Sequence, residues 1–185
     1  MKIFAHQPIE STGIASFERM KDIHGKAIFD FYKSKEAKDL ILHNSYGEPE
    51  EMPVEVFFRD HLDFTTLEHL ALIECSGKIL DLGAGAGAHA LVLQDWGKEV
   101  IALDYSPGCC QVMRQSGVSN VVEEHYQKHQ EKYDTVLMLM NGIGVVGDLT
   151  GFSAFLKWTK KVLNQGGQVL LDSSDISYLY EDDLE

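Results

Sequence analysis

The sequence lacks a long hydrophobic run: no stretch approaches the ~18–20 apolar residues that a membrane-spanning helix needs. Residues 1–10 also lack an apolar segment as long as that of a secretory signal. From these two absences we expect a cytoplasmic protein that is not exported and has no membrane partner.

Basic residues are scarce. Sixteen Lys and Arg stand against 29 Asp and Glu, which gives a net charge of −13, and the basic residues form no cluster. Phosphate backbones are repelled by such a surface unless basic side chains gather on one face. Nucleic acid is therefore a poor candidate for the substrate, and a small molecule is the better one.

Cysteine is also rare, with only Cys75, Cys109 and Cys110. An odd number of cysteines without an export signal is typical of reduced thiols in a cytosol. Cys109 and Cys110 are adjacent, and the eight histidines form no zinc-binding pattern with cysteine. The sequence therefore predicts no metal site.

What is present is an ordinary globular composition over 185 residues, with 44% apolar and 24% charged residues. This length predicts one domain with a small addition. The pattern of apolar residues along the chain changes near residue 77. Before it, helical spacing and a Thr65-x-x-Glu68 capping box predict helices and loops. The expected elements are helices over 15–33, 36–43 and 66–75, the last ended by Gly77, and a loop over 44–53. We therefore divide the chain into an N-terminal helical cap (1–76) and a second domain (77–185).

In the second domain, short apolar runs alternate with helical segments. The expected strands are 78–82, 100–104, 118–122, 135–140 and 168–172. The expected helices are 87–96, 107–116 and 151–164, with Gly97, Gly117 and Gly166-Gly167 at their ends. This alternation predicts an α/β fold with a doubly wound, mainly parallel sheet and helices on both faces.

The most informative segment runs from Ile79 to His89 and reads ILDLGAGAGAH. A buried strand leads into three alternating glycines and then into a helix. Ligands of open α/β sheets bind beyond the carboxyl ends of the strands, where this turn lies. The segment predicts a small-molecule site, although a tight turn without a ligand has the same residues.

Two cofactor classes fit this turn. Gly83, Gly85 and Ala88 satisfy the GxGxxA pattern of dinucleotide-binding proteins, and Asp104 follows at the spacing of a ribose-binding acid. However, Asp81 puts a carboxylate beside the glycines, which repels a pyrophosphate but suits an ammonium or sulfonium group. The third glycine is also at 87 rather than 88.

The segment Asp81–Gly87 resembles motif I of the class I S-adenosylmethionine-dependent methyltransferases, which have a Rossmann-like fold. The resemblance continues through residues 100–107, 132–137 and 163–168 and covers about 77–172. It implies that Asp81 holds the methionine ammonium of the cofactor and that Asp104 accepts both ribose hydroxyls. The cofactor-binding residues that it implies are Asp81, Gly83, Ala84, Gly85, Gly87, Asp104, Tyr105, Glu124, His125, Met140 and Asn141.

The third strand departs from the family pattern, which often has an acid near the adenine amino group. Here Glu124 and His125 both stand at that place, and the sequence does not choose between them. His125 suits stacking or hydrogen bonding with adenine, but a single histidine in a loop is more often only solvated.

The resemblance places the methyl acceptor beyond the fourth strand, above residues 141–144. Asn141 has the first position of the Asn-Pro-Pro-aromatic signature of enzymes that methylate amino groups of nucleic acids, but the rest is absent. We expect Asn141 to contact the site as the candidate catalytic residue; the alternative is a turn residue that bonds its own backbone. Candidate contacts from the cap are Tyr32, Tyr46, Phe57, Phe58, Arg59 and His61, although core packing or exposure is the commoner role of each.

Only 13 residues follow Asp172 (185 − 172 = 13), too few for the C-terminal hairpin that completes the family's seven-stranded sheet. We therefore expect a chain without the hairpin strands, whose exposed fifth strand pairs in a homodimer or larger assembly.

The function that the sequence favours is methyl transfer from S-adenosylmethionine to a small molecule. Two alternatives remain: an NAD-dependent oxidoreductase, and a truncated protein that binds S-adenosylmethionine without catalysis.

Overall fold

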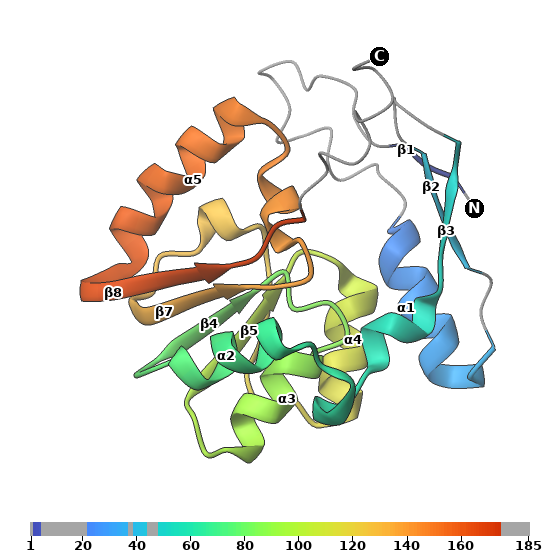
Figure 1. Cartoon of the computed structure of the whole chain (residues 1–185), viewed down its shortest axis with the longest axis horizontal. Coiled ribbons are helices and arrows are strands. Elements are labelled where there is room, and N and C mark those ends of the chain that lie inside the picture. Colours follow the sequence, from blue (N-terminus) through green and yellow to red (C-terminus); the bar gives the residue numbers. More distant parts are fainter. Residues whose placement is uncertain (1, 5–21, 37–38, 44–47, 175–185) are drawn as a thin grey trace, which may run out of the picture.

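The computed structural model describes residues 2–4, 22–36, 39–43 and 48–174. Its centre is a parallel five-stranded sheet in the order β6-β5-β4-β7-β8 (Figure 1). The strands are β4 (Ile79–Leu82), β5 (Val100–Asp104), β6 (Val121–Glu123), β7 (Tyr133–Met138) and β8 (Leu163–Leu171). The predicted parallel sheet is confirmed, and β4 lies in the middle of it with a neighbour on each side.

Alternate residues of the central strands face two different hydrophobic clusters, as expected for a sheet that is covered on both faces. In β5, Val100 and Ala102 pack in one cluster and Ile101 and Leu103 in the other. Helices α2 (Thr66–Glu74), α3 (Ala88–Asp95) and α4 (Pro107–Ser116) contribute to the first cluster. Helix α5 (Leu149–Val162) covers the other face (Figure 1).

The glycines of β8 correct one prediction. Helix α5 ends at Val162, and Leu163 is already extended, so Gly166 and Gly167 lie inside β8 instead of ending the helix. Gly166 has φ +80°, and the pairing of β7 with β8 shifts register between Tyr133 and Thr135. The two glycines therefore accommodate an irregularity in the strand.

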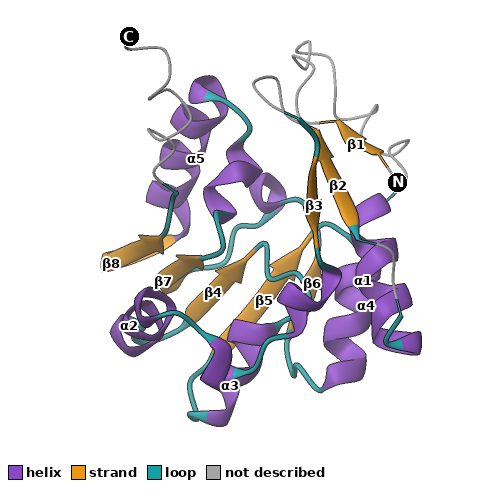
Figure 2. Ribbon diagram, turned by 45° about the vertical axis from the view of Figure 1, so that its right-hand side comes forward, coloured by secondary structure: helices purple, strands orange, loops and turns teal. Residues whose placement is uncertain are grey.

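The N-terminal part contains a second sheet that the sequence did not reveal (Figure 2). Its strands are β1 (Lys2–Phe4), β2 (Leu40–His43) and β3 (Glu50–Met52). The predicted helix over 36–43 and the continuous loop over 44–53 are therefore wrong, and this part is not purely helical. The four residues of β2 are too few to show a distinctive period, so the pairing of this strand with distant strands decided its structure.

Helix α1 (Ile23–Ser34) replaces the predicted helix over 15–33, of which residues 15–21 lie outside the described residues. It begins at Asp22, whose side chain accepts a hydrogen bond from the Gly25 N–H. Helices α1 and α4 lie side by side (Figure 2). This contact attaches the N-terminal part to the edge of the sheet next to β5 and β6.

Helix α2 confirms the capping box. Thr65 Oγ1 accepts from the Glu68 N–H, and Glu68 Oε2 accepts from the Thr65 N–H. The helix ends at Glu74, so Gly77 lies in the following loop, not at the helix end. Among the described residues, no helix is both long and apolar enough to cross a membrane.

Candidate functional site

The glycine turn joins the end of β4 to α3 in the middle of the sheet. Gly83 and Gly85 have φ +73° and +57°, values that residues with a side chain rarely adopt. The N–H groups of Gly83 and Ala84 both donate to the Leu103 carbonyl of β5, at 2.8 and 3.2 Å. A Cβ at Gly85 would meet no atom within 4 Å, so a ligand can approach the backbone there.

Asp81 lies in β4 just before this turn, and only 2% of it is exposed. Its Oδ2 atom is buried, and no hydrogen bond from the described residues reaches it. Burial raises the pKa of Asp81 to about 6, and Asp104 adds to this effect, while His89 and the Ala90 N–H oppose it. A buried carboxylate oxygen without a partner suits a ligand that brings a positive charge and hydrogen-bond donors.

Asp104 ends the neighbouring strand β5 and is also buried, with 7% exposed. Its Oδ2 accepts from the Gly85 N–H at 3.0 Å and its Oδ1 from the Ser106 N–H at 2.9 Å. Burial raises the pKa of Asp104 above its ordinary value, although these two bonds lower it. Each oxygen keeps acceptor capacity, so the carboxylate can bind two adjacent hydroxyl groups.

Two rings lie beyond Asp104, at the ends of β5 and β6. The rings of Tyr105 and His125 are 6.4 Å apart at 44°. The Gln127 N–H donates to His125 Nδ1 at 3.4 Å, so this nitrogen carries the lone pair. Burial lowers the pKa of His125, and Lys128 lowers it further. His125 is therefore neutral near pH 7, with its proton on Nε2.

The comparisons with known proteins agree with this arrangement. The sequence matches the family described as methyltransferase domain over residues 33–185, which is most of the chain. The chain belongs to this methyltransferase family. The family predicted from the motifs is thereby confirmed.

A solved structure supports the assignment. The crystal structure of an S-adenosylmethionine-dependent methyltransferase from Bacteroides fragilis, in complex with S-adenosylhomocysteine, is 42% identical. The match has a TM-score of 0.83 and covers 88% of this chain and 69% of that one. This likeness confirms the predicted Rossmann-like α/β fold.

More distant structures share the fold alone. PH0226 from Pyrococcus horikoshii OT3 is 23% identical, with a TM-score of 0.52 over 63% of this chain and 55% of that one. The sugar N-methyltransferase KedS8 from Streptoalloteichus sp ATCC 53650 is 15% identical, with a TM-score of 0.53 over 71% of this chain and 57% of that one. A comparison with curated proteins gave no match.

The sequence left Glu124 and His125 as alternatives for the residue near the adenine of the cofactor. In this methyltransferase the two residues have different surroundings. The Glu124 carboxylate oxygen Oε1 lies 2.5 Å from His129 Nδ1, and His129 Nε2 lies 2.5 Å from the Tyr133 hydroxyl. The carbonyl of His129 accepts from Trp158 Nε1 of α5. Glu124 is thus part of a hydrogen-bonded group that fastens the loop after β6 to α5.

Met140 and Asn141 follow β7 with φ +58° and +57°, in the left-handed region. The Asp172 carboxylate, just after β8, accepts from both backbone N–H groups, at 2.9 and 2.7 Å. The Asn141 side-chain oxygen accepts from the Ser174 N–H and hydroxyl, at 2.9 and 3.0 Å. The candidate catalytic residue is therefore at the expected edge of the sheet, but its oxygen bonds the chain after β8.

Gly87 has a packing role. A Cβ there would lie 2.9 Å from side-chain atoms of Met113 and Val118, and its φ is +88°. The glycine lets α3 begin close to α4, and its contact with a cofactor stays a prediction. The structure gives other roles to two candidate contacts from the cap: Tyr32 donates to the Gln115 carbonyl and Arg59 pairs with Glu68. Tyr46 lies outside the described residues.

Sequence reasoning missed Asp22 and His24, which reach the edge of the site from α1. Asp22 accepts from the Ser106 hydroxyl and from the Gly108 N–H, each at 2.9 Å, so it caps α4 as well as α1. Burial lowers the pKa of His24, while Asp104 and Asp22 raise it. The only available signal was a capping acid before an apolar helix, and nothing in the sequence gave its distant partners.

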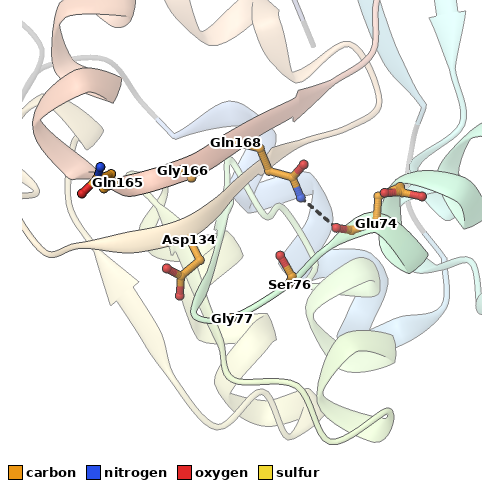
Figure 3. A pocket seen from close by; sticks show the side chains of 8 residues that line it. Glu74, Ser76, Gly77, Asp134, Gln165, Gly166 and Gln168 are labelled. Carbon is orange, nitrogen blue, oxygen red and sulfur yellow. Dashed lines mark hydrogen bonds between the residues drawn. The ribbon is translucent and has the colours of Figure 1, made fainter.

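A cavity of about 480 Å³ lies at the other end of the sheet (Figure 3). Glu74, Ser76, Gly77 and Asp134 line it, at the amino ends of β4 and β7. Gln168 of β8 donates across it to the Glu74 carbonyl at 2.7 Å. Since ligands of open parallel sheets bind at the carboxyl ends of the strands, this cavity is separate from the candidate site.

Proposed function

We propose that this methyltransferase binds S-adenosylmethionine at the carboxyl ends of β4 and β5 and transfers its methyl group to a small molecule. One observation carries the proposal: the buried Asp81 Oδ2 has no hydrogen-bond donor among the described residues, beside an open glycine turn. The ammonium of the cofactor's methionine part fits that oxygen. Asp104, on the next strand, fits the vicinal hydroxyls of a ribose.

The remaining residues would orient the cofactor. We assign the adenine to the neighbourhood of Tyr105 and His125, because the Glu124 carboxylate already has His129 as its partner. A neutral His125 offers a ring face on which adenine can stack. The predicted contacts of Gly83, Ala84 and Gly85 fit backbone that a ligand can approach closely.

The chemical step asks little of the protein beyond alignment. S-adenosylmethionine, when bound, supplies an electrophilic methyl group bonded to a sulfonium that leaves as a thioether. The chain's residues would hold the acceptor in line with that bond and exclude water. We assign the orientation of the acceptor to Asn141, whose position is fixed by Asp172 and Ser174. The net charge of −13 supports a small-molecule acceptor over a nucleic acid.

Calorimetry with S-adenosylhomocysteine and with NAD tests the cofactor. We expect binding of the first and none of the second, and binding of NAD alone would overturn the proposal. Incubation with methyl-labelled S-adenosylmethionine and fractions of a metabolite extract then tests catalysis. Labelled product is the expected result, whereas cofactor binding without transfer to any fraction would favour a non-catalytic binding protein.

We also propose a homodimer. In the described part of the chain, β8 pairs with β7 alone, and a strand at the edge of a sheet favours pairing with a second copy. Sedimentation at micromolar concentration should give twice the mass of 20.7 kDa. A single species of monomer mass would contradict this proposal.

The division into a cap (1–76) and a cofactor-binding domain (77–185) and the cytoplasmic location are likewise proposals. Leu72 and Cys75 of the cap pack in the same cluster as Ile79 of β4, so the two parts share a core. A single calorimetric unfolding transition is expected from such a shared core.

The buried, unbridged Cys75, Cys109 and Cys110 support a reducing compartment.

A further inference from the structure

A second cavity, of about 580 Å³, lies between helix α5 and the loop that follows β6. The residues that α5 contributes share one face of the helix, because they are three, four and seven positions apart. The residues that line the cavity are Gln127, His129 and Gln130 of the loop and Ala154, Lys157, Trp158 and Lys161 of α5. None of these lining residues is acidic, so two lysines stand at a cavity whose lining holds no carboxylate.

The lysines of α5 have no acidic neighbours on their own helix. This helix contains Lys157, Lys160 and Lys161 and neither Asp nor Glu, although the whole chain has a net charge of −13. Elsewhere, Arg59 and Lys78 pair with carboxylates at 2.7 and 2.8 Å. Within the described ranges, none of the three lysines of α5 forms an ion pair. Helix α5 is therefore a local excess of positive charge on a negatively charged protein.

The helix dipole explains only part of this charge. Lys160 and Lys161 lie in the last turn of α5, where a positive charge interacts favourably with the helix C-terminus. Lys157 lies before that turn, and the effect of the dipole fades beyond it. Moreover, Lys157 and Lys161 line the same cavity, whereas Lys160 does not. The dipole gives no reason for two positive charges at one cavity.

The buried part of the cavity wall is held in one arrangement. Trp158 Nε1 donates to the His129 carbonyl at 3.0 Å, and the Trp158 ring lies 5.0 Å from the Tyr126 ring at 77°. The two ring nitrogens of His129 each lie 2.5 Å from an oxygen, one of Glu124 and the other of Tyr133. These polar groups are already satisfied. A ligand therefore meets a fixed wall here and takes its hydrogen bonds from the exposed lining residues.

Those exposed residues supply hydrogen-bond donors. Lys157 and Lys161 each bring an ammonium group with three donors, and Gln127 and Gln130 each bring a side-chain amide. Lysines four positions apart on a helix have Cβ atoms about 6 Å apart, so both ammonium groups can reach one ligand group. A phosphate group has several strong acceptor oxygens and a charge between about −1 and −2, and lysine binds it as a point charge.

We propose that this cavity binds a small molecule that carries a phosphate or diphosphate group. The inference is independent of the proposed function, because no residue at the carboxyl ends of β4 and β5 lines the cavity. Charges at the surface act over the screening length, about 8 Å at physiological ionic strength. A single phosphate group thus interacts mainly with the two lysines, whereas a long nucleic acid would also meet the acidic surface beyond them.

Isothermal titration calorimetry with inorganic pyrophosphate tests the site. We expect saturable binding to the wild type, and about fivefold weaker binding to Lys157→Gln and to Lys161→Gln. This factor is smaller than a buried charged hydrogen bond would give, because both lysines are exposed. Lys160→Gln is the matched control, since it removes the same charge from an exposed position of α5 outside the cavity. It should change the dissociation constant by less than about twofold.

Ala154→Phe separates a site in the cavity from a general attraction to the lysines. Ala154 is exposed and lines the cavity, so a phenyl ring there would occupy the space without changing any charge. We expect this variant to weaken pyrophosphate at least tenfold. Ser153→Phe, at the exposed neighbouring position outside the cavity, should bind like the wild type. Unchanged binding to Ala154→Phe would contradict the proposal.

The remaining outcomes also decide. Absence of saturable pyrophosphate binding to the wild type overturns the proposal, and so does equal weakening by all three lysine variants, which would mean attraction to α5 as a whole. Binding of a short single-stranded DNA that pyrophosphate does not displace would identify a macromolecular ligand and overturn it as well. Circular dichroism checks that each variant is folded. If one lysine variant did not fold, the other one and Ala154→Phe provide the same test.

Discussion

The backbone N–H of Gly85 donates to Oδ2 of Asp104 at 3.0 Å, which connects the glycine turn after β4 to the acid that ends β5. The Ser106 N–H donates to the other oxygen at 2.9 Å. Asp104 therefore shapes the turn and offers its remaining acceptor capacity to a ligand. Both roles need a carboxylate with two acceptor oxygens.

Asp104→Ala removes both roles, and we expect it to weaken binding of S-adenosylhomocysteine at least about 100-fold, the sum of two hydrogen bonds to a charged group. Asp104→Asn keeps one acceptor oxygen and should show an intermediate loss. Isothermal titration calorimetry gives both dissociation constants. Asp95→Ala, at the exposed end of α3, is the control. If Asp104→Ala left the dissociation constant of S-adenosylhomocysteine unchanged, the assignment of Asp104 to the ribose would be refuted.

Asp81 should lower the stability of the ligand-free protein at neutral pH. Its pKa rises from 3.8 to about 6 on burial, so the folded state holds a proton that the unfolded state releases between these values. Stability is therefore lost as pH rises from about 4 to 6. Asp81→Asn should be more stable than wild type by up to about 3 kcal/mol at pH 8, with no gain below pH 4.

Urea unfolding at pH 4, 6 and 8 measures this difference. The same variant should lose binding of S-adenosylhomocysteine, because a neutral amide cannot pair with an ammonium. Stability gained and affinity lost at one position would identify Asp81 as a functional residue. A variant that is less stable than wild type at pH 8 would contradict the assigned cost.

The strands and helices of the methyltransferase domain could be predicted from the sequence, because the local preferences of these residues agree with the tertiary structure. The strand over 100–104 and the helix over 107–116 have the bounds that the sequence predicted, and Gly117, at φ +97°, ends the helix as expected. Buried parallel strands are continuous apolar runs, and caps are local, so no distant contact is needed to recognise them.

The second sheet and the two ion pairs of Glu68, with Arg59 and with His89, depend on contacts between distant residues. Strand β2 forms because β1 and β3 pair with it, and its residues have no period that separates strand from helix. Glu68 was recognisable as a capping residue, but its pairs with Arg59 and His89 span 9 and 21 residues. Chemical type alone gives no reason to connect them.

The close contact between α1 and α4 predicts that Gly108 cannot be replaced by a larger residue without a loss of stability. A Cβ at Gly108 would lie 2.4 Å from the backbone carbonyl of Gly25, so one helix would have to move. We expect Gly108→Ala to lower the free energy of unfolding by about 1–3 kcal/mol, the range observed for overpacked cores. Thermal unfolding measures it.

Gly117→Ala is the matched control. Gly117 also belongs to the end of α4, but a Cβ there would meet no atom within 4 Å, and only its φ of +97° opposes a side chain. Its cost should be about 1 kcal/mol, from backbone strain alone. If the two variants lost equal stability, close packing of α1 on α4 would not be the reason for Gly108.

The last prediction concerns the turn after β7. Asp172→Asn replaces one acceptor by an N–H₂ group that faces the N–H of Met140 or Asn141. We expect it to destabilise the protein by about 1–3 kcal/mol, because one backbone donor loses its partner. Ser174→Ala removes only the hydroxyl bond to Asn141 and should cost less.

Met140→Gly distinguishes support of the left-handed turn from a simple loss of hydrogen bonds. Glycine adopts the φ of +58° at Met140 without strain, so it should stabilise this turn by up to about 1 kcal/mol. If Asp172 holds the strained conformation, Met140→Gly should recover part of the stability lost in Asp172→Asn, which makes the double variant more stable than the sum of the two single effects. Urea unfolding of the four proteins gives the coupling energy. Strict additivity would mean that Asp172 and the conformation of Met140 are independent.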